Sequence, residues 1–234
     1  MNRSDPRGAD PEVLAAWVAG WAASRGVGPP RPEGNGHYVE VGLAHHRARY
    51  VFPTIGVAEL RDRAEAIGER WVFLKVCLPG ELLAAAWPAG WAVQSSSTML
   101  TVALSGVGRS PSAPSGYRLA IREDGPKLIA SMTGPGGDLA ASGRLVTGGR
   151  HGILDQIITE EAHRRRGLGR CVMGALAGAA LDRGAVEGVL VATEAGRRLY
   201  ETLGWQVHAA YTSAVVPGDE SGRPEIRSDT SFPT

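Results

Sequence analysis

Four arginines surround two glycines in the segment HRRRGLGR, residues 163–170. An apolar helical pattern follows, and the N-terminus of a helix exposes unpaired backbone N–H groups and the positive end of the helix dipole. Without Cβ atoms at Gly167 and Gly169, a pyrophosphate can approach those amides closely. The flanking arginines add long-range positive charge. The segment therefore predicts a phosphate site, with a basic turn in solvent as the simpler alternative.

The residues on both sides of this segment predict the elements that hold it. Residues 152–159 are typical of a strand, and apolar residues from Leu168 to Leu176 recur at helical spacing, with Gly184 placed as a left-handed cap. Upstream, four strand-like runs predict an antiparallel meander: YRLAIRED, KLIASMT, LAASGRLVT and GILDQIITE. Downstream we expect a strand in VEGVLVA, a helix over 194–203 and one or two closing strands over 205–216.

The first hundred residues have helix and strand patterns of their own. Val13, Trp17 and Trp21 share one stripe of a predicted helix over 11–25, and tryptophans at such spacing are more often core than ligand-binding residues. The other elements expected here are strands over 38–42 and 47–52, a helix over 57–67, a strand over 71–78, a short helix before Pro88 and an extended segment over 91–104.

The segment SGVGRSPSAPSG, residues 105–116, consists almost entirely of Gly, Ser, Pro and Ala. Such a composition buries too little apolar surface to offset the entropy of ordering it. We therefore predict an N-terminal α/β domain over 1–110, a second domain over 111–217 and a flexible tail over 218–234.

The basic loop resembles the coenzyme A loop of the GNAT superfamily of acyl-CoA-dependent N-acetyltransferases. That loop reads Gln or Arg, two residues, Gly, one residue, then Gly or Ala, and the sequence here is RRRGLG at 164–169. A second stretch, LYETLGW at 199–205, resembles the family's other hallmark. The resemblance covers residues 117–216 and implies an α/β (α+β) fold, in which helices flank a mixed, mostly antiparallel sheet. The smaller α/β domain of residues 1–110 precedes it.

The same resemblance implies acetyl-CoA as co-substrate and Tyr200 as the residue that protonates the departing thiolate. A tyrosine hydroxyl is neutral at pH 7, and its unperturbed pKa of about 10 is close to that of a thiol. The alternative for Tyr200 is a ring that packs in the core. The implied coenzyme contacts are the backbone of Ile157, Ile158 and Thr159 for the pantetheine, the loop residues Arg164, Arg165, Arg166, Gly167, Leu168, Gly169 and Arg170 for the pyrophosphate, and Thr193.

The sequence also departs from the family pattern. Thr193 occupies the position of an asparagine that binds pantetheine or water in many members, and Gly188 occupies the position of a glutamate base. Asp155 is the remaining candidate for the general base, because a period of two places it on the same strand face as Thr159; the alternative is an aspartate that pairs with an arginine or caps a turn. The family's early pair of helices has no room within 122–127, so we expect the N-terminal domain to pack there.

The composition and the remaining sequence patterns disfavour several other classes of protein. The chain has 25 Lys and Arg against 24 Asp and Glu, which disfavours a protein devoted to nucleic acid. The N-terminus has no signal-peptide pattern and no apolar run reaches membrane-spanning length, so we expect no membrane partner and a cytoplasmic location. The two cysteines are expected to be buried apolar residues. The histidines at 37, 45 and 46 have no ligand spacing, so no metal is predicted.

These patterns predict an N-acetyltransferase that moves an acetyl group from acetyl-CoA to a primary amine by direct attack in a ternary complex. The acceptor is an unassigned small molecule or peptide, and the oligomeric state stays open, a homodimer included. Two alternatives remain: a catalytically silent module that binds acyl-CoA, and a nucleic acid or protein interaction module that uses the Arg164–Arg166 run.

Overall fold

The computed structural model of the chain describes residues 8–107 and 112–218. The N-terminal part contains α1 (Pro11–Arg25), β1 (Arg31–Glu33), β2 (Gly36–Leu43), β3 (His46–Phe52), α2 (Val57–Ala66), β4 (Val72–Val76), α3 (Gly80–Leu83), η1 (Ala84–Ala86), β5 (Ala92–Val93), β6 (Ser97–Ala103) and η2 (Leu104–Gly106). The C-terminal part contains β7 (Arg118–Asp124), β8 (Lys127–Thr133), β9 (Leu139–Gly148), β10 (His151–Thr159), η3 (Glu161–His163), α4 (Leu168–Asp182), β11 (Glu187–Thr193), α5 (Glu194–Thr202) and β12 (Gln206–Val215).

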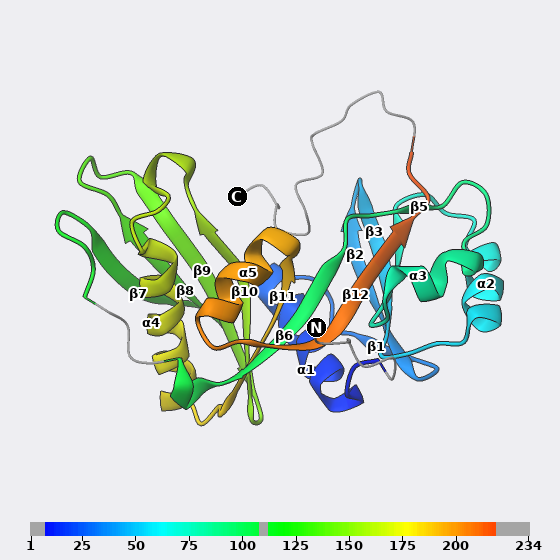
Figure 1. Cartoon of the computed structure of the whole chain (residues 1–234), viewed down its shortest axis with the longest axis horizontal. Coiled ribbons are helices and arrows are strands. Elements are labelled where there is room, and N and C mark those ends of the chain that lie inside the picture. The colour runs from blue at the N-terminus through cyan, green and yellow to red at the C-terminus, as the bar shows by residue number, and fades with distance from the viewer. Residues whose placement is uncertain (1–7, 108–111, 219–234) are drawn as a thin grey trace.

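The strands of the described ranges form one twelve-stranded sheet. Its order is β1-β2-β3-β4-β12-β6-β11-β10-β9-β8-β7, and β5 pairs with β12 beside this path. Figure 1 shows the two ends of the sheet on opposite sides of the molecule, with β6 and β12 side by side in the middle. The mixed, mostly antiparallel sheet with flanking helices that we predicted is confirmed, and so is the meander from β7 to β10.

The chain uses the same connection twice. β3 pairs in parallel with β4 after crossing through α2, and β10 pairs in parallel with β11 after crossing through α4. The next long strand after each unit pairs with the other unit: β6 pairs with β11, and β12 pairs with β4. Because β6 and β12 are exchanged in this way, neither half completes its sheet from its own strands.

Helix α1 covers the middle of one sheet face and contacts strands of both halves, among them β2, β9, β10 and β11. Its start is fixed by Asp10, whose side chain accepts hydrogen bonds from the backbone N–H groups of Glu12 and Val13 at 2.7 and 3.3 Å. The helix lies close to β10, since a Cβ atom on Gly20 would be 2.3 Å from Cγ1 of Ile153. The expectation that N-terminal residues cover this part of the sheet is therefore confirmed.

Two further cores lie on the opposite sheet face. One is beneath α4, where Val172 and Leu176 are fully buried against β8, β9 and β10. The other lies beneath α2, where Leu60 packs with Phe52 and Leu74. Alternation along β10 separates the faces, because Ile153 belongs to the α1 core and its neighbour Leu154 to the α4 core.

Most predicted elements match within a few residues, and the three-residue strand β1, which contains Pro32, was missed. Cys77 and Cys171 are buried as expected, and burial raises the pKa of both thiols. The predicted boundary after residue 110 and the tail beyond 218 lie mostly outside the described residues. One sheet spans both predicted domains. The division of the chain at residue 110 into two domains therefore stays a proposal. None of the described helices is long and apolar enough to cross a membrane.

Candidate active site

A cavity of about 280 Å³ lies where α1, β6, β10, β11 and α5 meet. Residues from both halves of the chain line it: Trp17, Trp21, Ser97, Leu154, Asp155, Gln156, Ile157, Ile158, Thr159, Arg164, Leu190, Val191, Ala192, Thr193, Gly196 and Tyr200. It brings together both predicted catalytic residues, the predicted pantetheine strand, Thr193 and the first arginine of the basic loop. It also includes Trp17 and Trp21, which we expected only in the core and which are 3% and 1% exposed.

The cavity exists because β10 and β11 separate. Their parallel pairing ends at Ile153 and Val189, although both strands continue, so the backbone of residues 157–159 has a strand neighbour only on the β9 side. A β-bulge adds to the separation: Asp155 pairs with Arg144, and the next paired residue on β10 is Ile158. An unpaired strand edge offers N–H and C=O groups to a ligand with amides of its own, as pantetheine has.

The prediction that Asp155 and Thr159 lie on the same face of the strand is wrong, because the bulge lies between them. One extra residue reverses the alternation of side chains along β10, so Asp155 shares its face with Ile158, and Thr159 points to the α4 side. The extra residue is accommodated by Gln156, whose φ of 50° lies in the left-handed region that non-glycine residues rarely adopt. A period-two pattern cannot reveal a bulge, which explains the error.

Helix α4 begins next to the end of β10. Gly167 is its N-cap, with φ of 75°, and supplies no side-chain cap, while the first turn contains no acidic residue. The other two long helices next to the cavity, α1 and α5, are capped by Asp10 and Thr193. A Cβ atom on Gly169 would lie 3.5 Å from Oγ1 of Thr159, in ordinary contact with a cavity-lining side chain. This uncapped helix N-terminus is the kind that binds anions.

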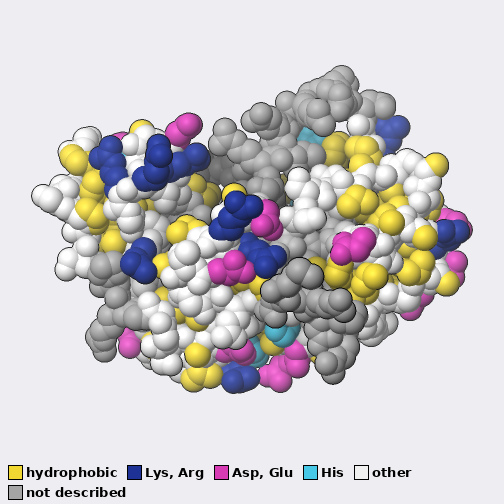
Figure 2. Space-filling view, in the orientation of Figure 1, with side chains coloured by type: hydrophobic (Ala, Val, Ile, Leu, Met, Phe, Trp, Pro, Cys, Tyr) yellow, Lys and Arg dark blue, Asp and Glu magenta, His cyan; other side chains and the backbone are white. Residues whose placement is uncertain are grey.

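The basic residues at this end of α4 have different roles. Arg164 lines the cavity, and its Nε donates to the carbonyl of Thr159 at 3.4 Å. Arg166 instead donates to the hydroxyl oxygen of Tyr117 at 3.0 Å, while Arg165 and Arg170 are exposed. In Figure 2, Lys and Arg side chains gather at the upper left, over the N-terminal end of α4.

A hydrogen-bonded chain that sequence reasoning missed holds this loop. His163 lies between Tyr117, whose hydroxyl is 3.0 Å from Nδ1, and Asp138, whose Oδ2 is 2.7 Å from Nε2. Because Arg166 donates to the Tyr117 oxygen, the arrangement is satisfied when the hydroxyl donates to Nδ1 and Nε2–H donates to Asp138. The hydrogen bond from His163 lowers the pKa of Asp138. The three residues come from distant segments and form no sequence motif.

Tyr200 lies half-buried on α5 and lines the cavity. Burial is the main cause that raises its pKa from 10.0 to about 12, and the negative charge of Asp155 raises it further. Its ring centroid is 6.0 Å from that of Trp205, so packing and cavity lining occur together. The hydroxyl thus keeps its proton throughout the neutral range.

Thr193 joins β11 to α5 and lines the cavity. Its hydroxyl accepts a hydrogen bond from the backbone N–H of Gly196 at 3.3 Å, which caps α5 and leaves the hydroxyl proton free to be donated elsewhere. A side chain at Gly188, the position of the family's glutamate, would be crowded, since its Cβ would be 3.0 Å from side-chain atoms of Leu104, Trp205 and Val102.

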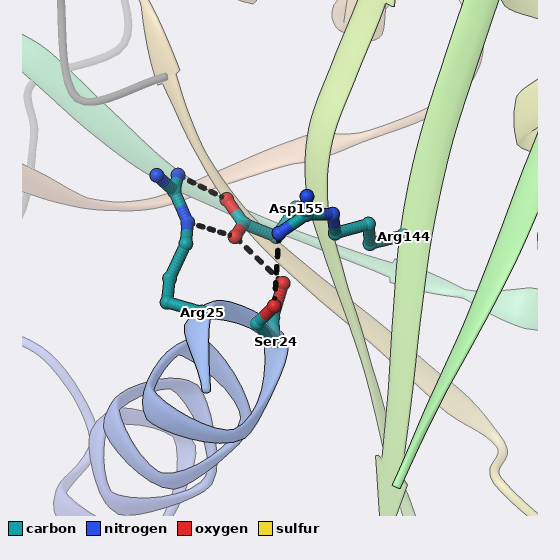
Figure 3. Close-up of polar contacts among 4 residues, drawn as sticks. All are labelled: Ser24, Arg25, Arg144 and Asp155. Atoms are coloured by element: carbon teal, nitrogen blue, oxygen red, sulfur yellow. Dashed lines mark hydrogen bonds and ion pairs between the residues drawn. The ribbon is translucent and has the colours of Figure 1, made fainter. Parts of the chain in front are cut away.

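Asp155 is held by the last turn of α1, as Figure 3 shows. Arg25 donates from Nε to Oδ2 at 2.6 Å and from Nη2 to Oδ1 at 3.0 Å, and the Ser24 hydroxyl donates to Oδ2 at 2.9 Å. Arg144, the β9 partner of Asp155, donates to the carbonyl of Ser24 at 3.0 Å. Burial and the neighbouring Arg25 charge lower the pKa of Arg144. This arrangement matches the alternative in which the aspartate pairs with an arginine.

None of the N-terminal histidines lines the cavity. His45 stacks edge-on against Trp71, and His46 contacts Trp21 and Phe73. Within the described ranges, no three His, Cys, Asp or Glu side chains come together as a metal site.

Comparisons with known proteins agree with this geometry. Residues 98–205 match the model of the acetyltransferase (GNAT) family. A GCN5-related N-acetyltransferase from Kribbella flavida superposes with a TM-score of 0.65 at 18% identity, covering 92% of this chain and 98% of its own. A putative GNAT acetyltransferase from Novosphingobium aromaticivorans gives 0.55 at 18% identity, covering 89% and 100%. A tandem GNAT protein from the clavulanic acid biosynthesis pathway gives 0.51 at 14% identity, covering 70% and 69%. A comparison with curated protein sequences gives no match.

The class is therefore that of the GNAT acetyltransferase fold: residues 98–205 match the model of that family, and the sheet and its flanking helices match the fold of its solved members. The match begins within β6, earlier than the resemblance that the motifs suggested. The matched segment therefore includes most of β6, the exchanged strand that pairs with β11.

Proposed function

We propose that this protein transfers an acetyl group from acetyl-CoA to a primary amine of a small molecule or peptide. The observation that carries the proposal is the opening between β10 and β11 beyond Ile153. At that opening an unpaired strand edge and Tyr200 line one cavity, and the uncapped N-terminus of α4 lies next to Thr159, one of the lining residues. Each of these groups suits a different part of an acyl-CoA.

The residues fit the coenzyme in two places. The backbone at Ile157, Ile158 and Thr159 would bind the pantetheine amides as a neighbouring strand does. The amides at the start of α4, from Leu168 to Arg170, would bind the pyrophosphate, with Arg164 and Arg165 adding positive charge. Arg166 would act mainly through the loop that it stabilises, because its guanidinium donates to Tyr117 and to the carbonyl of Ala162.

When bound, acetyl-CoA supplies the acetyl group as a thioester. A backbone amide at Ile158 or Thr159 would stabilise the negative charge that develops on the thioester oxygen. The Tyr200 hydroxyl would donate its proton to the sulfur of the leaving thiolate. The amine must reach the carbonyl without its extra proton; water and Asp155 are the two candidates for removing that proton, and the contacts of Asp155 with Arg25 and Ser24 bear on the choice between them.

The proposal is tested by measuring acetyl-CoA binding and thiol release with a panel of amines: a polyamine, an amino acid, an aromatic amine and a peptide N-terminus. We expect micromolar binding, and amine-dependent release of free coenzyme A with at least one acceptor. Binding without turnover across a broad panel would favour a silent coenzyme-binding module. Absence of binding would contradict the proposal.

A further inference from the structure

We propose that Arg25 and Asp155 form a positioning pair, in which α1 holds the β10 bulge in its active shape and Asp155 does not serve as the general base. The inference rests on the proposed acetyl transfer for its kinetic consequences. It assigns a function to Arg25, a residue that no sequence motif singled out. It also gives α1, whose Trp17 and Trp21 line the cavity, a role in positioning β10.

The first argument is the geometry of the carboxylate. Both oxygens of Asp155 accept hydrogen bonds, two from Arg25 and one from Ser24, and the side chains of Asp155 and Arg25 are 7% and 1% exposed. A base that takes a proton from the acceptor amine would have to give up this buried bidentate ion pair. Breaking a buried ion pair is strongly unfavourable, because it leaves a desolvated charge without its counter-ion.

The second argument is the position of the pair along β10. Asp155 is the last residue paired with β9 before the bulge, and Gln156 follows it at φ of 50°. A non-glycine residue in this conformation is strained and persists only where its surroundings fix it. Asp155 is fixed by Arg25 and Ser24, while its β9 partner Arg144 is fixed by the Ser24 carbonyl, so both strands are tied to α1 where the bulge begins (Figure 3).

The third argument concerns what the bulge presents. The residues after it, Ile157 to Thr159, line the cavity and provide the backbone edge proposed to bind the thioester and the pantetheine. A displacement of about 1 Å in such groups is enough to lower the rate about 100-fold. The Asp155 charge also helps raise the pKa of Tyr200, which keeps the proton on that hydroxyl. In this proposal the ion pair acts on the site through the position of β10.

The experiment compares Arg25→Met, Asp155→Asn and the double variant. If the pair positions the bulge, each single variant lowers kcat by about 10- to 100-fold, and the double variant falls no further than the slower single variant. The pH dependence of kcat keeps its wild-type shape in Asp155→Asn. A matched control is Arg47→Met, which removes an exposed ion pair to Glu69 at 3.2 Å and should leave kcat unchanged.

General-base catalysis by Asp155 gives a different pattern. Asp155→Asn would then lose about 10²- to 10⁴-fold in rate and recover at high pH, where the amine deprotonates by itself. Arg25→Met would then retain Asp155 as the base and keep most of the enzyme's activity. The acid limb of the pH profile of kcat would move. Either result in a folded variant overturns the positioning pair.

A second measurement does not depend on turnover. Hydrogen exchange of the amides of residues 156–159 should accelerate in Arg25→Met and Ser24→Ala, relative to the control variant. Unchanged exchange there overturns the inference even if no acceptor is found. Should Arg25→Met fail to fold, Ser24→Ala and Arg25→Lys give the same comparison, since each weakens the arrangement by one contact. A wild-type protein that binds no acetyl-CoA contradicts the proposed function and leaves the exchange result to decide on the pair.

Discussion

Gly169→Val places a branched side chain where the proposed pyrophosphate meets the first turn of α4. The Cβ direction at this residue points toward Oγ1 of Thr159 at 3.5 Å, so the added methyl groups extend from the helix toward the cavity. Gly169 has no positive φ, unlike its neighbour Gly167 at 75°, so the substitution adds bulk without forcing the backbone. Gly167→Ala would mix backbone strain with lost binding and is the poorer test.

The expected magnitude follows from the hydrogen bonds that are lost. A hydrogen bond from a backbone amide to a charged group contributes about 1.5 to 3 kcal/mol. Loss of one such bond raises the Kd for acetyl-CoA by about 10- to 150-fold. The stability change should stay within about 1 kcal/mol, because valine has a somewhat better helix propensity than glycine.

The assay is calorimetric titration with acetyl-CoA, alongside the Tm of the unliganded protein. Gly178→Val is the matched control: it makes the same substitution in the same helix, at a position where a Cβ atom has no neighbour within 4 Å. We expect wild-type affinity in the control. A folded Gly169→Val protein with the affinity of the control would refute the assignment of the phosphate site.

Five further outcomes are expected from four changes to the protein. Tyr200→Phe should lower kcat by about 10²- to 10⁴-fold with little change in acetyl-CoA affinity, because only the proton donor is lost. Burial raises the Tyr200 pKa from 10.0 to about 12, so the unfolded chain loses this proton at a lower pH than the folded protein does. The free energy of unfolding of the wild type should therefore decrease as the pH rises from 10 to 12. This decrease should be smaller in Tyr200→Phe. His163→Ala should weaken acetyl-CoA binding by about 3- to 10-fold through a looser loop, with kcat at saturation nearly unchanged. Gly20→Ala should destabilise the protein by about 1 to 3 kcal/mol, measured by urea unfolding, because its Cβ would overlap Ile153. A fragment of residues 112–234 lacks β6 and should fail to give a monodisperse, active protein in gel filtration and turnover assays.

The results that would contradict these expectations are equally specific. Wild-type kcat in Tyr200→Phe, where chemistry limits the rate, would return the tyrosine to a packing role. Unchanged coenzyme affinity in His163→Ala would show that the loop holds its shape without the hydrogen-bonded chain. An active fragment of residues 112–234 would show that β11 and β12 can pair without β6.

Local sequence determined the elements and the loop chemistry. Apolar periodicity gave the helices over 11–25 and 168–182 to within a few residues, because amphipathic helices must place one stripe on a core. The two glycines after the basic run were placed at the junction between strand and helix, and α4 begins at Leu168 with Gly167 as its N-cap. The aromatic hydroxyl at Tyr200 was found by its motif and lies in the cavity.

The tertiary structure decided everything that depends on distant residues. The exchange of β6 and β12 is invisible in a strand pattern, because the pattern specifies which face is apolar and not which strand is the neighbour. The bulge after Asp155 reverses which sheet face the following side chains point to. The alternation of side chains along a strand cannot predict this, because it assumes that no residue is inserted. The ion pair of Asp155 with Arg25 joins residues 130 positions apart, so only the folded chain shows that this aspartate is buried against the last turn of α1.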